Sequence, residues 1–339
     1  MKNLKKTTPI FSVLLLLSII LAACAQPGAA PATQAPAAAA TQAPQDQPAV
    51  PVTLKIAVLP ILEALPMYVA QEQGYFAARG ISVEFIPVQS AAERDQIMAA
   101  GQADGMINDL VSTLFYNKDQ TQIQIVRFAR TATPEFAQYR IVASQQSGIT
   151  SVEGLKGVPI GISEGSVIAY TTDRLLQAEG FSPDEIKTIA VPKISDRMAL
   201  LASGELEAAN MPDPFSLLAM QSGAVLITDD RKHPEYGNSV ISFRKAVTDQ
   251  NSEAVRGFLA AIEQATQEIN KDASQWNNLL IEQQLVPAPL AGSYEVPTLP
   301  TASVPSEAQW SDVIDWAREK GLVSNDIAYA ESVNASFLP

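Results

Sequence analysis

The sequence predicts an α/β protein built from two similar lobes, each a mainly parallel sheet flanked by helices. Strand-like and helix-like runs alternate along the chain from Val52 onward, which is typical of parallel strands covered by helices. The same order of runs occurs again about a hundred residues later, and two extended segments connect the two halves. The 289 residues after residue 50 also exceed what one core usually supports.

The first half contains strands where apolar residues alternate or run together, and helices where they recur every three to four residues. The predicted strands are VTLKIAVLP (52–60), ISVEFIPV (81–88), ADGMIND (103–109) and IQIVRFA (123–129). The predicted helices are 64–80 and 90–100, which end at Gly80 and Gly101, and a third that precedes the last strand.

The second half repeats this order from GVPIGISEGS (157–166) onward. When AAGQADGMIND (99–109) is set beside LASGELEAANMPD (201–213), Gly101 matches Gly204 and Asp104 matches Glu207, both at an offset of 103. We therefore expect the second half to form a lobe like the first.

Two strands connect the halves, YRIVAS (139–144) entering the repeat and SVISFRKAV (239–247) leaving it, and we expect them to form a hinge. The later helices, 251–272 and 306–321, have no sheet of their own, so we expect them to pack onto the first lobe. The prediction is lobe 1 at 51–140 plus 245–339, and lobe 2 at 141–244.

The first 50 residues are expected to lie outside both lobes. Lys2, Lys5 and Lys6 precede an apolar run that is too short to cross a bilayer, so residues 1–23 are predicted to be a signal peptide. LAAC (21–24) resembles a bacterial lipobox, and Cys24, the only cysteine, is the predicted lipidation site, carrying palmitate or similar acyl chains. Residues 24–50, rich in Ala, Pro, Gln and Thr, are predicted to be a disordered tether. The expected location is the extracytoplasmic face of the cell membrane.

The formal charge is −13, and loss of the three signal-peptide lysines lowers it to −16. Such a charge argues against nucleic acid or an anionic lipid surface as a partner. It does not fix the sign of a buried site.

Five stretches between about residue 54 and residue 339 carry a family resemblance: 65–88, 91–110, 154–166, 198–215 and 315–339. Together they resemble the type II substrate-binding proteins of ABC importers, in particular the group that serves nitrate, sulfonate, taurine and the thiamine pyrimidine precursor. This resemblance implies a two-lobed type II fold and a protein that delivers a small molecule to a permease with two ATPase subunits. We expect a monomer.

By analogy with that family, the site would lie where strands end and helices begin. The implied ligand-binding residues are Glu63, Tyr68, Asn108, Asp109, Glu164, Ser166, Asn210, Asp213 and Phe215. The same analogy includes the loop from Pro60 to Glu63, Gly165 and Met211, and the candidates near the cleft or hinge are Tyr68, Arg130, Tyr139 and Phe243. Other roles remain open, because Asp109 and Asp213 also suit helix N-caps and Arg130 also suits an ion pair that closes the cleft without touching a ligand.

The carboxylates among these candidates make the cleft look unsuited to an anion, unless they turn away from it. Carboxylates, Asn and nearby aromatic rings instead suit a flat heterocycle with N–H donors. Riboflavin is the favoured ligand, since the tether and motifs resemble a riboflavin-binding lipoprotein of this superfamily. A thiamine pyrimidine precursor is the alternative, followed by a sulfonate, nitrate or an amine.

Catalysis is the rival interpretation, because a pyrimidine-synthase branch belongs to the same family. The only histidine, His233, stands in the polar stretch DDRKHPEYGN and is expected at the surface. No spacing predicts a metal site or a phosphate-binding loop, so we expect no catalytic residue, metal or cofactor. A ligand sensor that signals to a membrane receptor would use the same two lobes and hinge, and it remains a further alternative.

Overall fold

The computed structural model describes residues 51–339, and these form one unit with two five-stranded sheets. The predicted signal peptide, the tether and Cys24 lie outside the described residues. Within residues 51–339 we find no helix whose length and apolar character would let it span a bilayer.

The first sheet has the strand order β2-β1-β3-β10-β4, with β10 antiparallel to both of its neighbours. Its strands are β1 (Val52–Val58), β2 (Ile81–Pro87), β3 (Gly105–Asn108), β4 (Ile123–Thr131) and β10 (Asn238–Arg244). Gly105 must lack a side chain, because a Cβ there would lie 2.8 Å from the ring of Phe243 on the adjacent strand.

The second sheet repeats this pattern in the order β7-β6-β8-β5-β9, with β5 antiparallel to its neighbours. Its strands are β5 (Tyr139–Ala143), β6 (Pro159–Ile162), β7 (Lys187–Ala190), β8 (Ala208–Pro212) and β9 (Val225–Asp229). In both sheets the antiparallel strand follows a crossing between the lobes. The prediction of a two-lobed α/β fold with duplicated lobes is confirmed.

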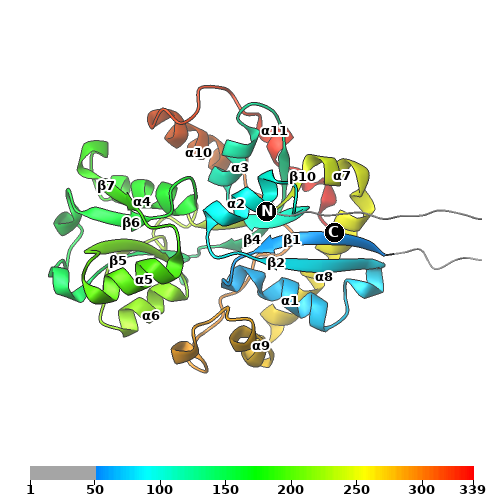
Figure 1. The fold of residues 1–339 in the computed structure, drawn as a ribbon, viewed down its shortest axis with the longest axis horizontal. Coiled ribbons are helices and arrows are strands. Elements are labelled where there is room, and N and C mark those ends of the chain that lie inside the picture. The colour runs from blue at the N-terminus through cyan, green and yellow to red at the C-terminus, as the bar shows by residue number, and fades with distance from the viewer. Residues whose placement is uncertain (1–50) are drawn as a thin grey trace, which may run out of the picture. The chain divides into compact units, whose positions relative to one another are not determined.

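Helices cover both faces of each sheet (Figure 1). Those of the second lobe are α4 (Val167–Ala178) on one face and α5 (Ile194–Ser203) with α6 (Phe215–Gln221) on the other. Those that follow the first sheet's strands are α1 (Leu65–Glu72), α2 (Ala91–Ala99) and α3 (Leu110–Asn117). The later helices are α7 (Lys245–Gln250), α8 (Ser252–Lys271), α9 (Asn277–Glu282), α10 (Glu307–Glu319) and α11 (Tyr329–Ser332).

Helix α8 packs on α1 in the core of the first lobe. Its buried residues recur every three to four positions, and Phe258 is fully buried between the rings of Phe76 and Phe243. Helix α10 differs from the prediction because it contacts both lobes. It packs on α3, and in the second lobe Asp173 of α4 accepts a 2.7 Å hydrogen bond from Trp316 Nε1.

The crossings between the lobes are residues 132–138 and 230–237, which precede β5 and β10. They lie side by side, since Ala132 N–H donates to the Gly237 carbonyl at 2.7 Å. The carboxylate of Asp230 accepts the backbone N–H groups of Gln138 and Tyr139 at 2.9 and 3.0 Å. The two strands predicted to form the hinge are therefore members of the two sheets, and the loops before them cross between the lobes. The second lobe was predicted to span 141–244, but this range includes β10, which pairs with β3 and β4 of the first sheet.

Candidate functional site

A cavity of about 60 Å³ lies between the lobes, at the ends of strands from both sheets. The first lobe contributes Leu59, Ile61, Glu63, Ala91, Arg94, Ile107, Asn108, Asp109 and Ser239, and Tyr139 comes from the start of β5 in the second sheet. The second lobe contributes Ser163, Ser166, Val167, Ile168, Pro192, Ile194, Arg197 and Pro212. This is the position at which open α/β sheets bind ligands.

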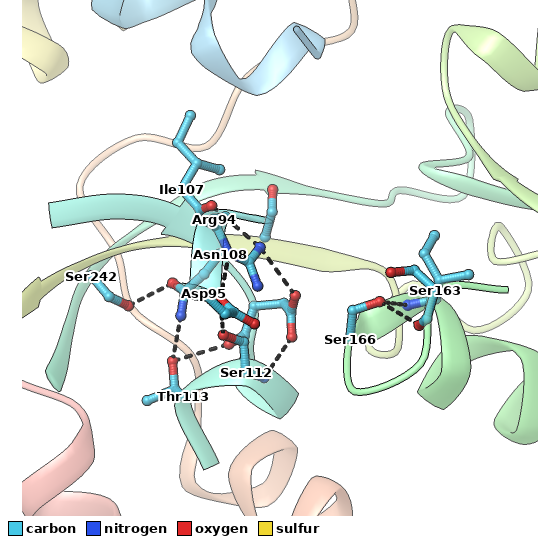
Figure 2. A network of polar contacts seen from close by, with 12 residues as sticks. Arg94, Asp95, Ile107, Asn108, Ser112, Thr113, Ser163, Ser166 and Ser242 are labelled. Carbon is cyan, nitrogen blue, oxygen red and sulfur yellow. Dashed lines mark hydrogen bonds and ion pairs between the residues drawn. The ribbon is translucent and has the colours of Figure 1, made fainter. Parts of the chain in front are cut away.

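Asn108, the last residue of β3, is held rigidly in the first lobe's wall (Figure 2). Its Oδ1 accepts a hydrogen bond from Ser242 Oγ at 2.7 Å, and its Nδ2 donates to Thr113 Oγ1 at 2.9 Å. Because both ends of the amide are engaged, Asn108 fixes the position of the β3–α3 turn.

The next residue, Asp109, is the N-cap of α3 and accepts the N–H of Ser112 at 2.8 Å. Arg94 of α2 lies beside it, with Nη1 3.7 Å from the carboxylate. Arg94 also pairs with Asp95 at 2.8 Å (Figure 2). Burial raises the pKa of Asp109 although Arg94 and the cap hydrogen bond favour its charged form. Asp109 therefore has the helix N-cap role that the sequence left open, and its carboxylate already has Arg94 as a cationic partner.

Glu63 is 3% exposed at the start of the helical segment after β1. Its Oε1 accepts a hydrogen bond from Gln138 Nε2 at 2.9 Å, whereas its buried Oε2 has no partner among residues 51–339. Burial raises the pKa of this carboxyl, and Arg130 opposes the shift. A buried carboxylate oxygen without a donor is suited to accept one from a ligand.

On the opposite wall, Ser166 caps α4 and its hydroxyl donates to the Ser163 carbonyl at 2.8 Å (Figure 2). The turn between them requires a left-handed conformation, which Gly165 adopts with φ of +66°. The buried Ser163 Oγ has no partner among the described residues.

Arg197 of α5 completes this wall and is 1% exposed. Its Nη1 donates to the carbonyls of Val191 and Pro192 at 2.7 and 3.3 Å, and its Nε has no partner in the described chain. Burial lowers the pKa of this guanidinium to about 10.

Asp213 lies beyond the cavity and ties the lobes together. Its carboxylate, at the end of β8, pairs with Arg130 of β4 and Arg140 of β5, both at 2.8 Å, and also accepts the hydroxyl of Tyr294. Burial by itself would raise the pKa of Asp213, but the two arginines outweigh it and hold the pKa below its ordinary value. Arg130 therefore forms the closing ion pair that was its alternative role.

A family model described as NMT1/THI5 like matches residues 62–275, more than half of the chain. The chain belongs to the NMT1/THI5-like family. A protein of Haemophilus influenzae named "Putative thiamine biosynthesis protein" is 23% identical over 275 residues, covering 78% of this chain and 85% of that protein.

Solved structures share the fold of this NMT1/THI5-like protein. The alkanesulfonate-binding protein SsuA from Xanthomonas axonopodis pv. citri, bound to MOPS, superposes with a TM-score of 0.70 at 17% identity, covering 84% of this chain and 99% of that one. The desulfurization enzyme DSZB superposes with a TM-score of 0.65 at 14% identity, covering 84% and 97%. The chain has the predicted periplasmic-binding-protein-like fold, and this fold hosts both binding proteins and an enzyme.

Four of the residues implied by the family resemblance line the cavity of this NMT1/THI5-like protein: Glu63, Asn108, Asp109 and Ser166. Among the further candidates, Tyr139 and the turn at Gly165 belong to the same region, whereas Phe243 is fully buried in the first lobe's core.

The other implied residues lie elsewhere. Tyr68 packs against Phe85 with ring centroids 4.9 Å apart, and the side chain of Glu164 is exposed. Asn210 donates hydrogen bonds to Thr171 and Thr172 of α4. Phe215 packs in the apolar cluster around α5 and α6.

Sequence reasoning missed Arg94, Ser163, Arg197 and Ser239, which all line the cavity. Nothing in the local sequence distinguishes Arg94 or Arg197 from surface arginines on amphipathic helices. Ser163 directly precedes Glu164, one of the implied residues. The rule that ligands bind where strands end, called the strand-end rule below, therefore comes within one residue of Ser163.

The expectation that carboxylates exclude an anion from the cleft is not supported by their placement. Asp109 faces Arg94, Asp213 is held by two arginines, and Glu164 turns to solvent. The sequence analysis excluded an anion unless the carboxylates turn away from the cleft. These three carboxylates are either paired with arginine or turned away.

Proposed function

We propose that this protein is the solute-binding component of an ABC importer. It captures a small single-ring heterocycle of the thiamine-pyrimidine-precursor kind and passes this ligand to a permease with ATPase subunits. The free Oε2 of buried Glu63 in the cavity between the lobes carries the proposal. Membership in the NMT1/THI5-like family and the name of the Haemophilus influenzae relative support this ligand class.

The chemistry of the cavity matches an aminopyrimidine. The exocyclic amino group of such a ring donates N–H bonds, which Glu63 is placed to accept. The walls that would face the ring are aliphatic and include Ile61, Ile107, Ile168 and Ile194. A hydrogen bond to a charged group contributes about 1.5–3 kcal/mol.

Riboflavin, favoured from the sequence, finds no support from the relatives. Of the two aromatic residues expected to stack on a flavin, Tyr68 does not line the cavity that contains Glu63. Phe215 lines a neighbouring cavity of about 750 Å³ together with Pro60 and Ile194.

A sulfonate is the second candidate, and the observation that favours it is Arg197, a buried cavity arginine without an ion-pair partner in the described chain. The alkanesulfonate-binding protein of the same fold agrees with this candidate. The two ligand classes are compared directly in the experiment below.

Binding without catalysis is proposed, although DSZB is an enzyme of this fold. The titratable residues that line the cavity are Glu63, Arg94, Asp109, Tyr139 and Arg197, and general acid–base chemistry near neutral pH more often uses His. The side chain of His233 is 37% exposed, pairs with Glu235 and does not line the cavity. Recovery of a bound aminopyrimidine unchanged after prolonged incubation is the expected outcome, and conversion to a product would establish an enzyme.

Anchoring at the outer face of the cell membrane through Cys24 is part of the proposal. The test is labelling with a clickable palmitate analogue, which we expect to mark the wild-type protein and not Cys24→Ser. Equal labelling of both proteins would contradict the anchor.

The ligand is tested by calorimetric titration of the purified protein with an aminopyrimidine, an alkanesulfonate and riboflavin. We expect saturable binding of the aminopyrimidine, weakened at least tenfold in Glu63→Gln and unchanged in the control Glu164→Gln, whose side chain is exposed. Binding that is insensitive to Glu63→Gln, or preference for riboflavin, would overturn the assignment.

A further inference from the structure

Arg197 differs from the other buried arginines of residues 51–339 in having no carboxylate partner. Each of the others has a carboxylate oxygen within 4 Å: Asp95 and Asp109 for Arg94, Glu263 for Arg127, and Asp213 for both Arg130 and Arg140. Removal of a guanidinium from water without a counter-charge is unfavourable. Consistent with this, burial is the cause that lowers the pKa of Arg197 to about 10.

The second lobe's wall has two polar groups without protein partners. Arg197 Nε and Ser163 Oγ are both buried, and neither makes a hydrogen bond within the described chain. Both residues line the cavity. A guanidinium and a hydroxyl are the donors with which proteins bind carboxylate, sulfonate or phosphate oxygens.

The first lobe's wall has the opposite character. Glu63 presents a buried carboxylate oxygen without a donor, whereas the other cavity carboxylate, Asp109, is accompanied by Arg94. The unmatched charges are therefore a carboxylate on one lobe and a guanidinium on the other.

We propose that the ligand is bipolar, with an N–H-bearing group that binds Glu63 and an oxyanion or strongly accepting oxygen group that binds Arg197 and Ser163. This inference rests on the proposed binding function of the same cavity. It narrows the ligand to amino-substituted compounds that also carry a sulfonate, phosphate or carboxylate group. A ligand of this kind contacts both lobes, so its two ends together favour the closed form.

The test uses matched probes on the full-length protein. One set is taurine, ethanesulfonate and ethylamine, and the other is an aminopyrimidine with and without a phosphorylated hydroxymethyl group. Calorimetry is expected to give each bipolar probe at least tenfold tighter binding than its one-ended analogues. Arg197→Gln should abolish the advantage of the phosphorylated over the unphosphorylated aminopyrimidine, whereas the control Lys156→Gln, an exposed charge of the same lobe, should retain it.

Urea unfolding separates a ligand-binding Arg197 from a structural one. In Arg197→Gln, relief of the unmatched buried charge opposes the loss of the hydrogen bonds to the carbonyls of Val191 and Pro192, so we expect an unfolding midpoint close to that of the wild type. Loss of binding accompanied by a large fall in the midpoint would overturn the assignment of Arg197 to the ligand. Equal affinity for bipolar and one-ended probes would overturn the inference and leave the proposed function standing if the plain aminopyrimidine still binds. Absence of saturable binding by every probe would overturn both.

Discussion

The carboxylate of Asp213 joins the lobes, and its removal should cost more stability than removal of its partner Arg130. Asp213 is 3% exposed and Arg130 1% exposed, and their charged atoms are 2.8 Å apart. In Asp213→Asn, Arg130 loses its only carboxylate partner within 4 Å among residues 51–339. An uncompensated buried charge of this kind costs about 3–5 kcal/mol.

Arg130→Met should be milder, because Asp213 keeps Arg140 at 2.8 Å and the hydroxyl of Tyr294. We expect a loss of about 1–3 kcal/mol. In the double variant neither buried charge of this pair remains, so its loss should be smaller than the sum of the two single losses by about 1–3 kcal/mol.

The assay is urea unfolding of all three variants at pH 7.5. Asp249→Asn is the control, because the Asp249–Lys245 pair has side chains 57% and 42% exposed and should change stability by less than about 0.5 kcal/mol. Additive effects in the double variant, or a larger loss in Arg130→Met than in Asp213→Asn, would refute the reasoning.

Three further predictions concern the hinge, the first lobe's core and α10. Burial raises the pKa of Asp230 to about 7, so near pH 6 the folded chain keeps a proton that the unfolded chain, with a pKa near 4, releases. Asp230 should therefore contribute about 2–3 kcal/mol less stability at pH 8 than at pH 5, and Asp230→Asn should reduce the pH dependence measured by urea unfolding by about this amount. Phe258→Ala should lose about 3–5 kcal/mol in the same assay, since its ring is fully buried, and a loss below 1 kcal/mol would contradict that packing. Trp316→Phe should lower the free energy of unfolding by about 1–3 kcal/mol, because it removes the buried hydrogen bond to Asp173. In the double variant with Asp173→Asn the loss should be smaller than the sum of the two single losses.

The fold could be predicted from the sequence because each element carries its own local signal. Gly80 and Gly204 adopt the left-handed conformation at the ends of helical segments, and the buried residues of α8 repeat with the helical period. The sheet to which β10 belongs has no such signal. All but the last of its residues are buried, so its sequence does not indicate which neighbours it pairs with.

The site was less predictable, because the strand-end rule gives the position of a residue and not the direction of its side chain. Asn108 and Asp109 face the cavity because Ser242, Thr113 and Arg94 hold them there. Asp213 follows the equivalent strand of the second lobe, yet its carboxylate faces arginines 83 and 73 residues away in the chain. Such partners become apparent only when the two lobes are assembled.

The same argument explains why the charge of the cavity differs from that of the chain. The formal charge is −13, and the carboxylates near strand ends are conspicuous in the sequence. Each arginine that pairs with one comes from another element: Arg94 from α2, Arg130 from β4 and Arg140 from β5. Because a buried site responds to the charges left without partners, the groups that we propose decide ligand choice are Glu63 and Arg197. A ligand that binds both would cancel the unmatched charge on each lobe, which a simple anion or a simple amine would do on only one.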